Sequence, residues 1–317
     1  MIVPTIDIGP FLDPNATPAA RDQVVQEVGR ACRDIGFLVV TNHGIPSTTI
    51  ENAFSVAKRY FDLDLSEKSK IPMTDDYPYG YESGEILSKS RDDGINLADL
   101  KETFQICLGA LGKTPKLTPV WPDQPNDFKD AMTTYYRGLE GLAEQIMRIF
   151  ACALDQPANW FDNKIDNHMS SLRILNYPHQ DQQPETEQIR ASAHTDYGSL
   201  TILAVDDAPG GLQVLSDGEW QSVKAPPNSF VVNLGDLMER WTNDHWRSTM
   251  HRVINPPVTS GKSNRRQSIA FFHCINFDTV VECIDSCQSP SNPPKYPPIL
   301  AGEHLLQKHA AAQGKKY

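Results

Sequence analysis

The stretch AHTDYGSLTILAV, residues 193–205, places two metal-ligating side chains directly before an apolar run. His194 and Asp196 are two positions apart, and in a β-strand such residues point to the same face with their Cα atoms about 7 Å apart. An imidazole and a carboxylate on one face can converge on one cation. The stretch therefore predicts a strand that carries two ligands of a metal site.

A third ligand has to come from elsewhere, and His251 in STMHRV, residues 248–253, is the natural candidate. Two histidines and one carboxylate on one face of an octahedron leave three open positions, an arrangement associated with non-haem Fe(II) oxygenases. A second His-x-Asp triplet, at residues 179–181, runs into polar residues of loop composition. No predicted strand holds that pair in register, so we do not interpret it as a metal site.

The segment NRRQSIAFFH, residues 264–273, is a second apolar strand, and it carries Arg266 and Ser268 at the same two-residue spacing. A guanidinium matches a carboxylate with two parallel hydrogen bonds, and a neighbouring hydroxyl can donate to the same group. Taken alone, Arg266 fits a solvated basic cluster with Arg265 and Lys262. Beside the predicted metal ligands, it indicates an anion site.

These residues, together with several shorter motifs, make the chain resemble the isopenicillin-N-synthase-like family of Fe(II)- and 2-oxoglutarate-dependent oxygenases. The resemblance covers nearly the whole length of the chain. Its further motifs are VPTIDI (residues 3–8), CRDIGFLVVTNHGIP (32–46), GGLQV (210–214), NLGD (233–236) and RV (252–253). The resemblance implies a mainly β fold with flanking helices, in which a double-stranded β-helix, or jelly roll, follows an N-terminal α/β region.

The resemblance also implies roles for individual residues. The iron ligands are then His194, Asp196 and His251, while Arg266 and Ser268 hold the distal carboxylate of 2-oxoglutarate.

Tyr177 matches a family position whose hydroxyl lies near this co-substrate. The implied reaction uses O2 to oxidise a small molecule by hydroxylation, desaturation or ring closure, and releases succinate and CO2. An Fe(II) oxidase that does not use 2-oxoglutarate and a metal-free jelly-roll binding protein are the alternatives.

Four regions are expected along the chain. Residues 1–110 form the N-terminal region with substrate-side loops, 111–165 a long bracing helix, 166–280 the catalytic jelly roll and 281–317 a C-terminal extension. Apolar periodicity predicts helices over residues 19–34, 47–61 and 126–153 and from about residue 301, a buried strand over 37–41, and short strands over 172–277.

The strand LRILNY, residues 172–177, has Arg173, Leu175 and Tyr177 on one face. If this face points into the barrel, an unpaired guanidinium there would be costly. We therefore expect Arg173 to lie near the iron and to pair with a carboxylate of the substrate or the co-substrate. An internal ion pair with a protein carboxylate is the alternative.

Residues 77–104 match in position a family segment that contributes to substrate selection. Tyr81 and Glu102 are the candidates for this role, with a capping tyrosine and a surface acid as the alternative interpretation.

Composition restricts the partners of the protein. A net charge of -11 argues against nucleic acid and anionic membranes, so the expected substrate is a small molecule, which the Arg173 argument would make carboxylate-bearing. No apolar run reaches the length of a membrane span or forms a signal peptide. The six scattered cysteines do not form a disulfide framework, which indicates the cytoplasm, and we expect a monomer.

Overall fold

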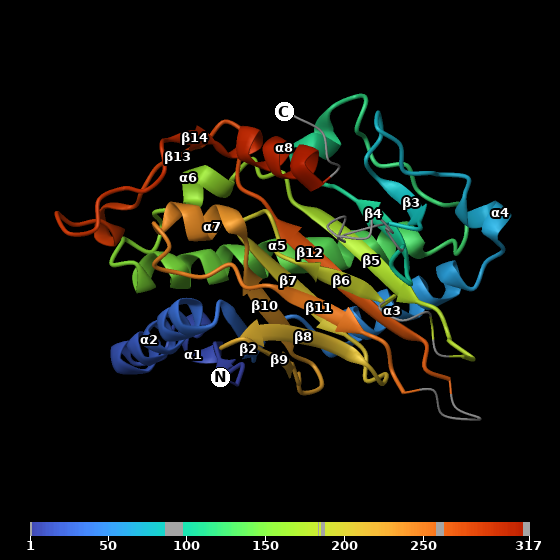
Figure 1. Ribbon diagram of the computed structural model, residues 1–317, viewed down its shortest axis with the longest axis horizontal. Coiled ribbons are helices and arrows are strands. Elements are labelled where there is room, and N and C mark those ends of the chain that lie inside the picture. The colour runs from blue at the N-terminus through green and yellow to red at the C-terminus, as the bar shows by residue number, and fades with distance from the viewer. Residues whose placement is uncertain (1, 86–97, 183, 185–187, 258–262, 313–317) are drawn as a thin grey trace.

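Two β-sheets packed face to face form the centre of the protein (Figure 1). The computed structural model describes residues 2–85, 98–182, 184, 188–257 and 263–312. The larger sheet has the order β1 (Thr5–Asp7), β2 (Phe37–Thr41), β10 (Phe230–Leu234), β7 (Leu200–Val205), β12 (Arg266–His273), β5 (Ser171–Tyr177), β4 (Glu102–Ile106) and β3 (Gly80–Ser83). The smaller sheet has the order β6 (Ala191–His194), β11 (His251–Ile254), β8 (Gly211–Ser216) and β9 (Glu219–Ser222).

The remaining elements surround these sheets. A short pair, β13 (Val280–Val281) and β14 (Ile299–Leu300), precedes the C-terminal helix. The helices are α1 (Gly9–Leu12), α2 (Pro18–Asp34), α3 (Ser47–Phe61), α4 (Leu65–Lys68), α5 (Phe128–Ala153), α6 (Asp162–Ile165), α7 (Asp236–Trp241) and α8 (Ala301–Ala312), and two single 3-10 turns cover Leu111–Lys113 and Asp285–Cys287. The helices and the strand expected from periodicity are confirmed to within about two residues at each end.

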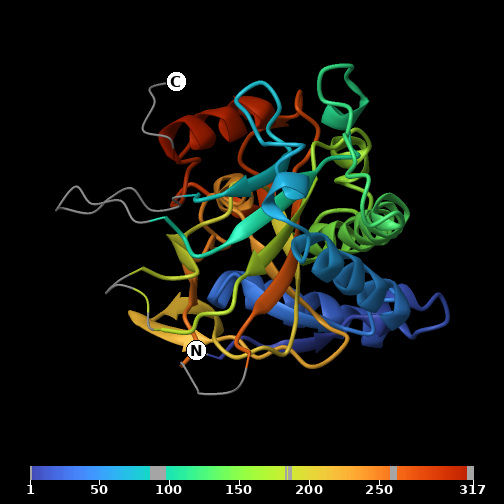
Figure 2. The ribbon, with the colours of Figure 1, turned by 90° about the vertical axis from the view of Figure 1, so that its right-hand side faces the viewer.

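Alternation along the strands gives the larger sheet two distinct faces. Its outer face, which includes Leu38, Val40 and Phe271, packs against the helices in the main apolar cluster. Figure 2 shows α3 and α5 on this side of the sheet and the smaller sheet on the other. The inner face, which includes Val39 and Val231, packs against the smaller sheet. This sandwich of two sheets with flanking helices confirms the predicted fold class.

The N-terminal region is part of the same sandwich. It supplies β1, β2, β3 and β4 to the two edges of the larger sheet. The ring of Phe37 in β2 makes an edge-on contact with His251, with ring centroids 5.4 Å apart. A sheet therefore crosses the expected boundary at residue 110, and the division into four regions stays a prediction.

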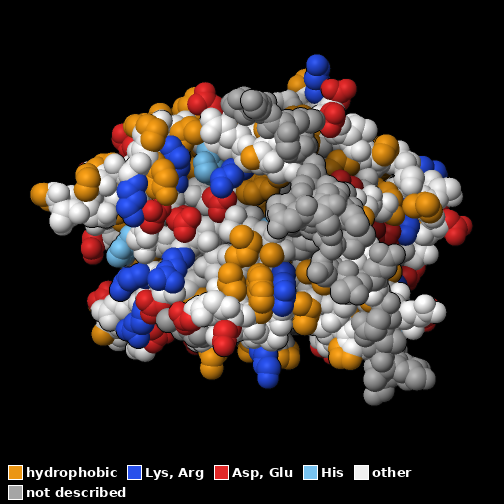
Figure 3. Space-filling view, viewed as in Figure 1, with side chains coloured by type: hydrophobic (Ala, Val, Ile, Leu, Met, Phe, Trp, Pro, Cys, Tyr) orange, Lys and Arg blue, Asp and Glu red, His pale blue; other side chains and the backbone are white. Residues whose placement is uncertain are grey.

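The surface has no single-sign character on the face shown in Figure 3, where Lys and Arg side chains are interspersed with Asp and Glu. Among the described residues, no helix has the length and apolar composition needed to cross a membrane.

Gly235 allows the turn before α7 to approach the loop that carries Asp196. The amide of Asp236 donates to the Asp196 carbonyl at 2.8 Å. A Cβ atom at position 235 would lie 2.2 Å from the carbonyl oxygen of Gly198. The backbone angles of Gly235 are open to any residue, so the constraint is steric.

Gly235→Ala should therefore displace the Asp196 loop. We expect the free energy of unfolding to fall by about 1 to 3 kcal/mol and the affinity for divalent metal to fall with it. Urea denaturation and metal titration measure the two effects. Gly141→Ala is the control, because Gly141 is an exposed helical glycine with nothing near its Cβ position. If the two variants had the same free energy of unfolding and the same metal affinity, the steric role of Gly235 would be contradicted.

Candidate active site

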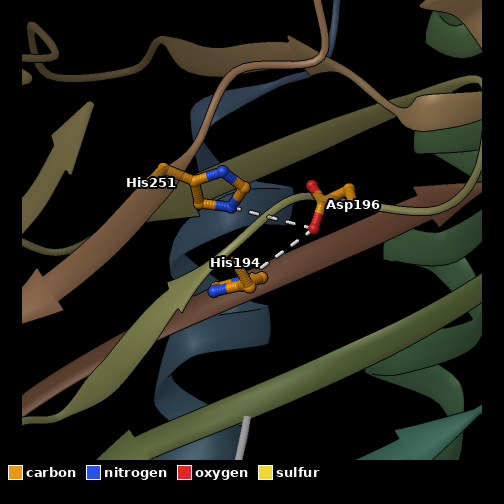
Figure 4. A group of neighbouring side chains, drawn as sticks. All are labelled: His194, Asp196 and His251. Atoms are coloured by element: carbon orange, nitrogen blue, oxygen red, sulfur yellow. Dashed lines mark ion pairs between the residues drawn. The ribbon is translucent and has the colours of Figure 1, made fainter. Parts of the chain in front are cut away.

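Three side chains meet where β6 and β11 pair (Figure 4). His194 ends β6, His251 begins β11, and the two are direct cross-strand partners. Their ring centroids are 4.3 Å apart. The Oδ1 atom of Asp196 lies 3.9 Å from Nε2 of His194 and 3.7 Å from Nε2 of His251. One ligand atom from each of the three residues lies within 4.8 Å of the other two. Among the described residues, this is the only group of three or more metal-ligating side chains that lie so close together.

One detail of the sequence prediction is wrong. The strand β6 ends at His194, so Asp196 lies in the following loop and does not share a strand face with it. The histidines instead converge because antiparallel register places them opposite each other, and Asp196 joins them from the loop.

Hydrogen bonds set the orientation of both imidazoles. Nδ1 of His194 lies 2.7 Å from the Ser192 carbonyl, and Nδ1 of His251 lies 3.1 Å from the Thr249 carbonyl. A carbonyl only accepts, so both Nδ1 atoms must donate. Each Nε2 lone pair is then free to bind a metal ion.

Asp196 is held by two neighbours on the inner face. Its Oδ2 atom accepts hydrogen bonds from Thr201 at 2.6 Å and from Asn233 at 2.7 Å, and these two residues are cross-strand partners on β7 and β10. This leaves Oδ1 directed at the histidines. The sequence analysis quoted Asn233 in a motif without giving it a role, and it did not single out Thr201.

The protonation states suit metal binding. Burial, followed by the charge of His251, lowers the pKa of His194 to about 4. Burial by itself would raise the pKa of Asp196, but the two histidines and the hydrogen bonds from Asn233 and Thr201 keep it below its usual range. At neutral pH the site therefore offers a neutral imidazole and a carboxylate, a donor set that fits Fe(II).

Arg266, Ser268 and Tyr177 lie together on the inner face, where Arg266 is the cross-strand partner of Tyr177. Arg266 is buried, its Nη1 donates to the Ser268 hydroxyl at 3.4 Å, and its guanidinium lies 5.0 Å from the centre of the Tyr177 ring. Within the described residues, no carboxylate lies at ion-pair distance from Arg266. A buried cation in this position can bind an external carboxylate.

Arg190 is a second cation beside Tyr177, and the sequence analysis missed it. Its side chain is fully buried, with the guanidinium 5.6 Å from the Tyr177 ring centre, and it donates to the carbonyls of Pro209 and Asn264. Burial, followed by the charge of Arg266, lowers its pKa to about 10. A lone arginine in a polar stretch gave no signal of this position.

Arg173 lies on the inner face, as expected, but its partners are protein side chains. It donates to Glu85 at 2.9 Å and to Gln105 at 2.7 Å, and a carboxylate oxygen of Glu82 lies 3.8 Å away. Lys101 forms a second ion pair with Glu85 at 2.9 Å. The expected pairing of Arg173 with a substrate or co-substrate carboxylate is therefore replaced by the internal ion pair.

Tyr81 and Glu102 lie on the outer face, away from the metal cluster. The hydroxyl of Tyr81 donates to Glu102 at 2.7 Å, and Lys68 pairs with the same carboxylate at 2.7 Å. Phe104, two positions after Glu102 on the same strand face, packs in the main apolar cluster with the helices. Both residues thus stabilise the contact between sheet and helices, and we no longer consider them substrate-binding candidates.

Two family models match the chain. Residues 3–124 match the model described as non-haem dioxygenase in morphine synthesis N-terminal, and residues 169–275 match the 2OG-Fe(II) oxygenase superfamily. The second match contains the whole His-Asp-His cluster and both residues of the Arg-x-Ser pair.

Named relatives agree over almost the full length. A homoarginine-6-hydroxylase of Glycine max is 35% identical, covering 96% of each chain. A 2-oxoglutarate-Fe(II) type oxidoreductase of Emericella nidulans is 33% identical, covering 98% of this chain and 90% of the relative. A Neurospora crassa structure solved with alpha-KG and thymine has a TM-score of 0.88 at 29% identity, covering 98% of this chain and 96% of that one.

Replacing Asp196 by Asn tests the anionic ligand. We expect the Fe(II) affinity to fall by at least about 100-fold, because an amide oxygen lacks the charge that the carboxylate supplies. Anaerobic Fe(II) titration measures the loss, with Asp207→Asn as an exposed control. Affinity close to that of the wild type would rule out the cluster as the metal site.

Glu85 should give the protein an acid-sensitive component of stability. Burial acts to raise its pKa, but Arg173 and Lys101 outweigh this and lower it to about 2. A carboxyl whose folded-state pKa is depressed stabilises the fold above its unfolded pKa of about 4.3, and this contribution is lost as pH falls toward 2. Up to about 3 kcal/mol follows from the shift.

Glu85→Gln should therefore reduce the fall in unfolding free energy between pH 5 and pH 2.5. Urea denaturation at a series of pH values measures it. Glu219→Gln, at an exposed position, should keep the wild-type slope. Parallel curves for Glu85→Gln and the wild type would show that this ion pair does not contribute.

Proposed function

Because the chain belongs to the 2-oxoglutarate- and Fe(II)-dependent oxygenase family, we propose that His194, Asp196 and His251 bind Fe(II) in this protein. The enzyme is a non-haem dioxygenase that oxidises a small molecule. Arg266, with Ser268 and Tyr177, binds the distal carboxylate of 2-oxoglutarate. The observation that carries this assignment is the buried Arg266 guanidinium, which has no carboxylate partner in the described part of the chain and lies on the inner face of the larger sheet.

The protein contributes positioning, charge and the exclusion of water. When bound, Fe(II) with 2-oxoglutarate and O2 supplies the oxidising power and releases succinate and CO2. The imidazoles are held by carbonyls, and Asp196 by Asn233 and Thr201. Tyr177 belongs to an apolar cluster with Leu175, Ala191, Val253 and Ala270, and such a lining limits the access of water to the site.

The alternatives are weaker. An Fe(II) oxidase without 2-oxoglutarate would use the Arg-x-Ser strand for another anion, but two relatives are named for their use of 2-oxoglutarate and a similar structure was solved with it. A metal-free binding protein would have no use for two imidazoles oriented by carbonyls.

Two of the similar proteins are named with polar, nitrogen-containing compounds. One relative is named for homoarginine hydroxylation and a similar structure was solved with thymine, so we take hydroxylation of such a metabolite as the reaction. We further propose that the enzyme works as a monomer in the cytoplasm, and its six unpaired cysteines are consistent with a reducing compartment.

Arg266→Ala tests the proposed co-substrate site. Loss of a charge-assisted pair in a dry pocket costs about 2 to 5 kcal/mol, so the KM for 2-oxoglutarate should rise some tens to thousands of fold while Fe(II) binding persists. Succinate formation at varied 2-oxoglutarate measures the KM.

Arg265→Ala is the matched control. Arg265 points to the outer face, where it donates to Asn176 and pairs with Asp62. The KM of the Arg265→Ala variant for 2-oxoglutarate should stay close to that of the wild type. An unchanged KM in Arg266→Ala would refute the assignment, and absence of any iron-dependent succinate formation in the wild type would refute the proposed function.

A further inference from the structure

A row of cross-strand partners on the inner face extends from the predicted co-substrate site to the edge of the sheet. Ser268 pairs with Leu175, Leu175 with Thr103, and Thr103 with Glu82. Cross-strand partners share a face, so Thr103 and Glu82 point to the same side as Ser268. Neighbouring strands are about 4.8 Å apart, which places Thr103 about 10 Å from Ser268.

Hydrogen bonds connect this end of the row to the strand that carries His194. The amide of Leu100 donates to the Ile189 carbonyl at 3.0 Å, and the amide of Ser192 donates to Asp99 at 3.0 Å. The segment that leads into β4 is therefore bonded to β6 close to His194. A small metabolite held by Thr103 and Glu82 can span the remaining distance of about 10 Å to the predicted co-substrate site.

Two polar atoms in this row have no hydrogen-bond partner among the described residues. One is the hydroxyl oxygen of Thr103, a residue that is 1% exposed, and the other is Oε2 of Glu82. Buried polar atoms without partners are rare in native proteins, and they call for a ligand or water. The Glu82 carboxylate only accepts hydrogen bonds, so its missing partner has to be a donor, while the Thr103 hydroxyl can accept from the same group.

The charges around Glu82 make a cationic donor the better match. Arg173 and Lys101 are both engaged with Glu85, at 2.9 Å each, while Glu82 only reaches Arg173 at 3.8 Å. Burial, followed by the charge of Glu85, raises the pKa of Glu82, and the charges of Arg173 and Lys101 offset this only in part.

We infer that the Glu82 carboxylate and the Thr103 hydroxyl form a substrate subsite for a protonated nitrogen group, an ammonium or a guanidinium, of a small metabolite. This inference rests on the proposed function. Arg173 and Lys101 are held by Glu85, which leaves Glu82 with only the long 3.8 Å contact to Arg173. They are positioning residues for this subsite.

Matched ligands that differ by one positive charge provide the test. L-homoarginine is compared with L-homocitrulline, in which a neutral urea group replaces the guanidinium. It is also compared with N-acetyl-L-homoarginine, which lacks the charged α-amine. Thymine serves as a neutral compound. Calorimetric titration without O2, on the full chain loaded with 2-oxoglutarate, measures binding independently of turnover.

The wild type should bind the compound with the recognised cation about 10- to 100-fold more tightly than its uncharged counterpart. Glu82→Gln should abolish this preference, and Thr103→Val should weaken it while retaining the charge. Glu219→Gln, which removes an exposed carboxylate, should keep the wild-type preference.

The inference fails if no cationic compound of the series binds, if thymine or another uncharged compound binds best, or if Glu82→Gln keeps the wild-type preference. Succinate formed without substrate separates this failure from that of the proposed function. If the wild type forms succinate slowly in an iron-dependent reaction but shows no preference for cations, only the inferred subsite is overturned. If it forms no iron-dependent succinate, the proposed function is overturned together with the subsite.

Discussion

The pairing of β6 with β11 is the constraint on which the rest of the site depends. It sets His194 opposite His251, and with the hydrogen bonds that orient the two imidazoles it brings their ring centroids to 4.3 Å. Asp196 can complete the cluster only because the loop after β6 is bonded through its backbone to the start of α7. A slip of one residue in this pairing would turn one histidine to the other face of the sheet. The hydrogen bonds between β6 and β11 therefore stabilise the smaller sheet and also position the metal ligands.

The inner face of the larger sheet distributes polar groups in an otherwise apolar sandwich. Thr201 and Asn233 sit at the metal end, and Arg266 and Ser268 lie farther along. Each of these groups either has a protein partner or faces the space between the sheets, where an anion or a metal ion can satisfy it. Burial of a polar group without such a partner would cost several kcal/mol. The sum over a few such groups would reach the whole free energy of unfolding of a typical domain, about 5 to 15 kcal/mol. The ligands are thus part of the energetic balance of the fold.

The sequence predicted the elements and the chemistry well, because both rest on local patterns. Helical periodicity defines α2, α3 and α5, and the His-x-Asp triplet with a distant histidine indicates iron. The failures are those that depend on register and long-range contact. The partner of Arg173 is Glu85, 88 residues away, in a segment with no periodic signal.

The face on which Tyr81 lies is a second example, because it depends on how β3 pairs with β4, and one residue more or less in the preceding turn would reverse it. The end of β6 at His194 is a third example. The loop that follows is held by backbone hydrogen bonds to the start of α7, about 40 residues later in the sequence, so its own residues do not predict it. Arg190 belongs to the same group, because its neighbours come from three distant segments.

The position of the predicted subsites within the sheet has a consequence for specificity. The proposed co-substrate residues lie on the inner strands β5 and β12, and His251 lies on the inner strand β11. His194 lies on the edge strand β6, where its pairing with β11 and the hydrogen bond to the Ser192 carbonyl hold it. Glu82 and Thr103 lie on the last two strands, β3 and β4, at the edge of the larger sheet. Changes at an edge disturb fewer hydrogen bonds and packed side chains than changes in the centre. Substrate preference can therefore vary in this architecture while the iron chemistry stays constant, which fits a fold whose relatives carry names as different as homoarginine hydroxylase and clavatol oxidase.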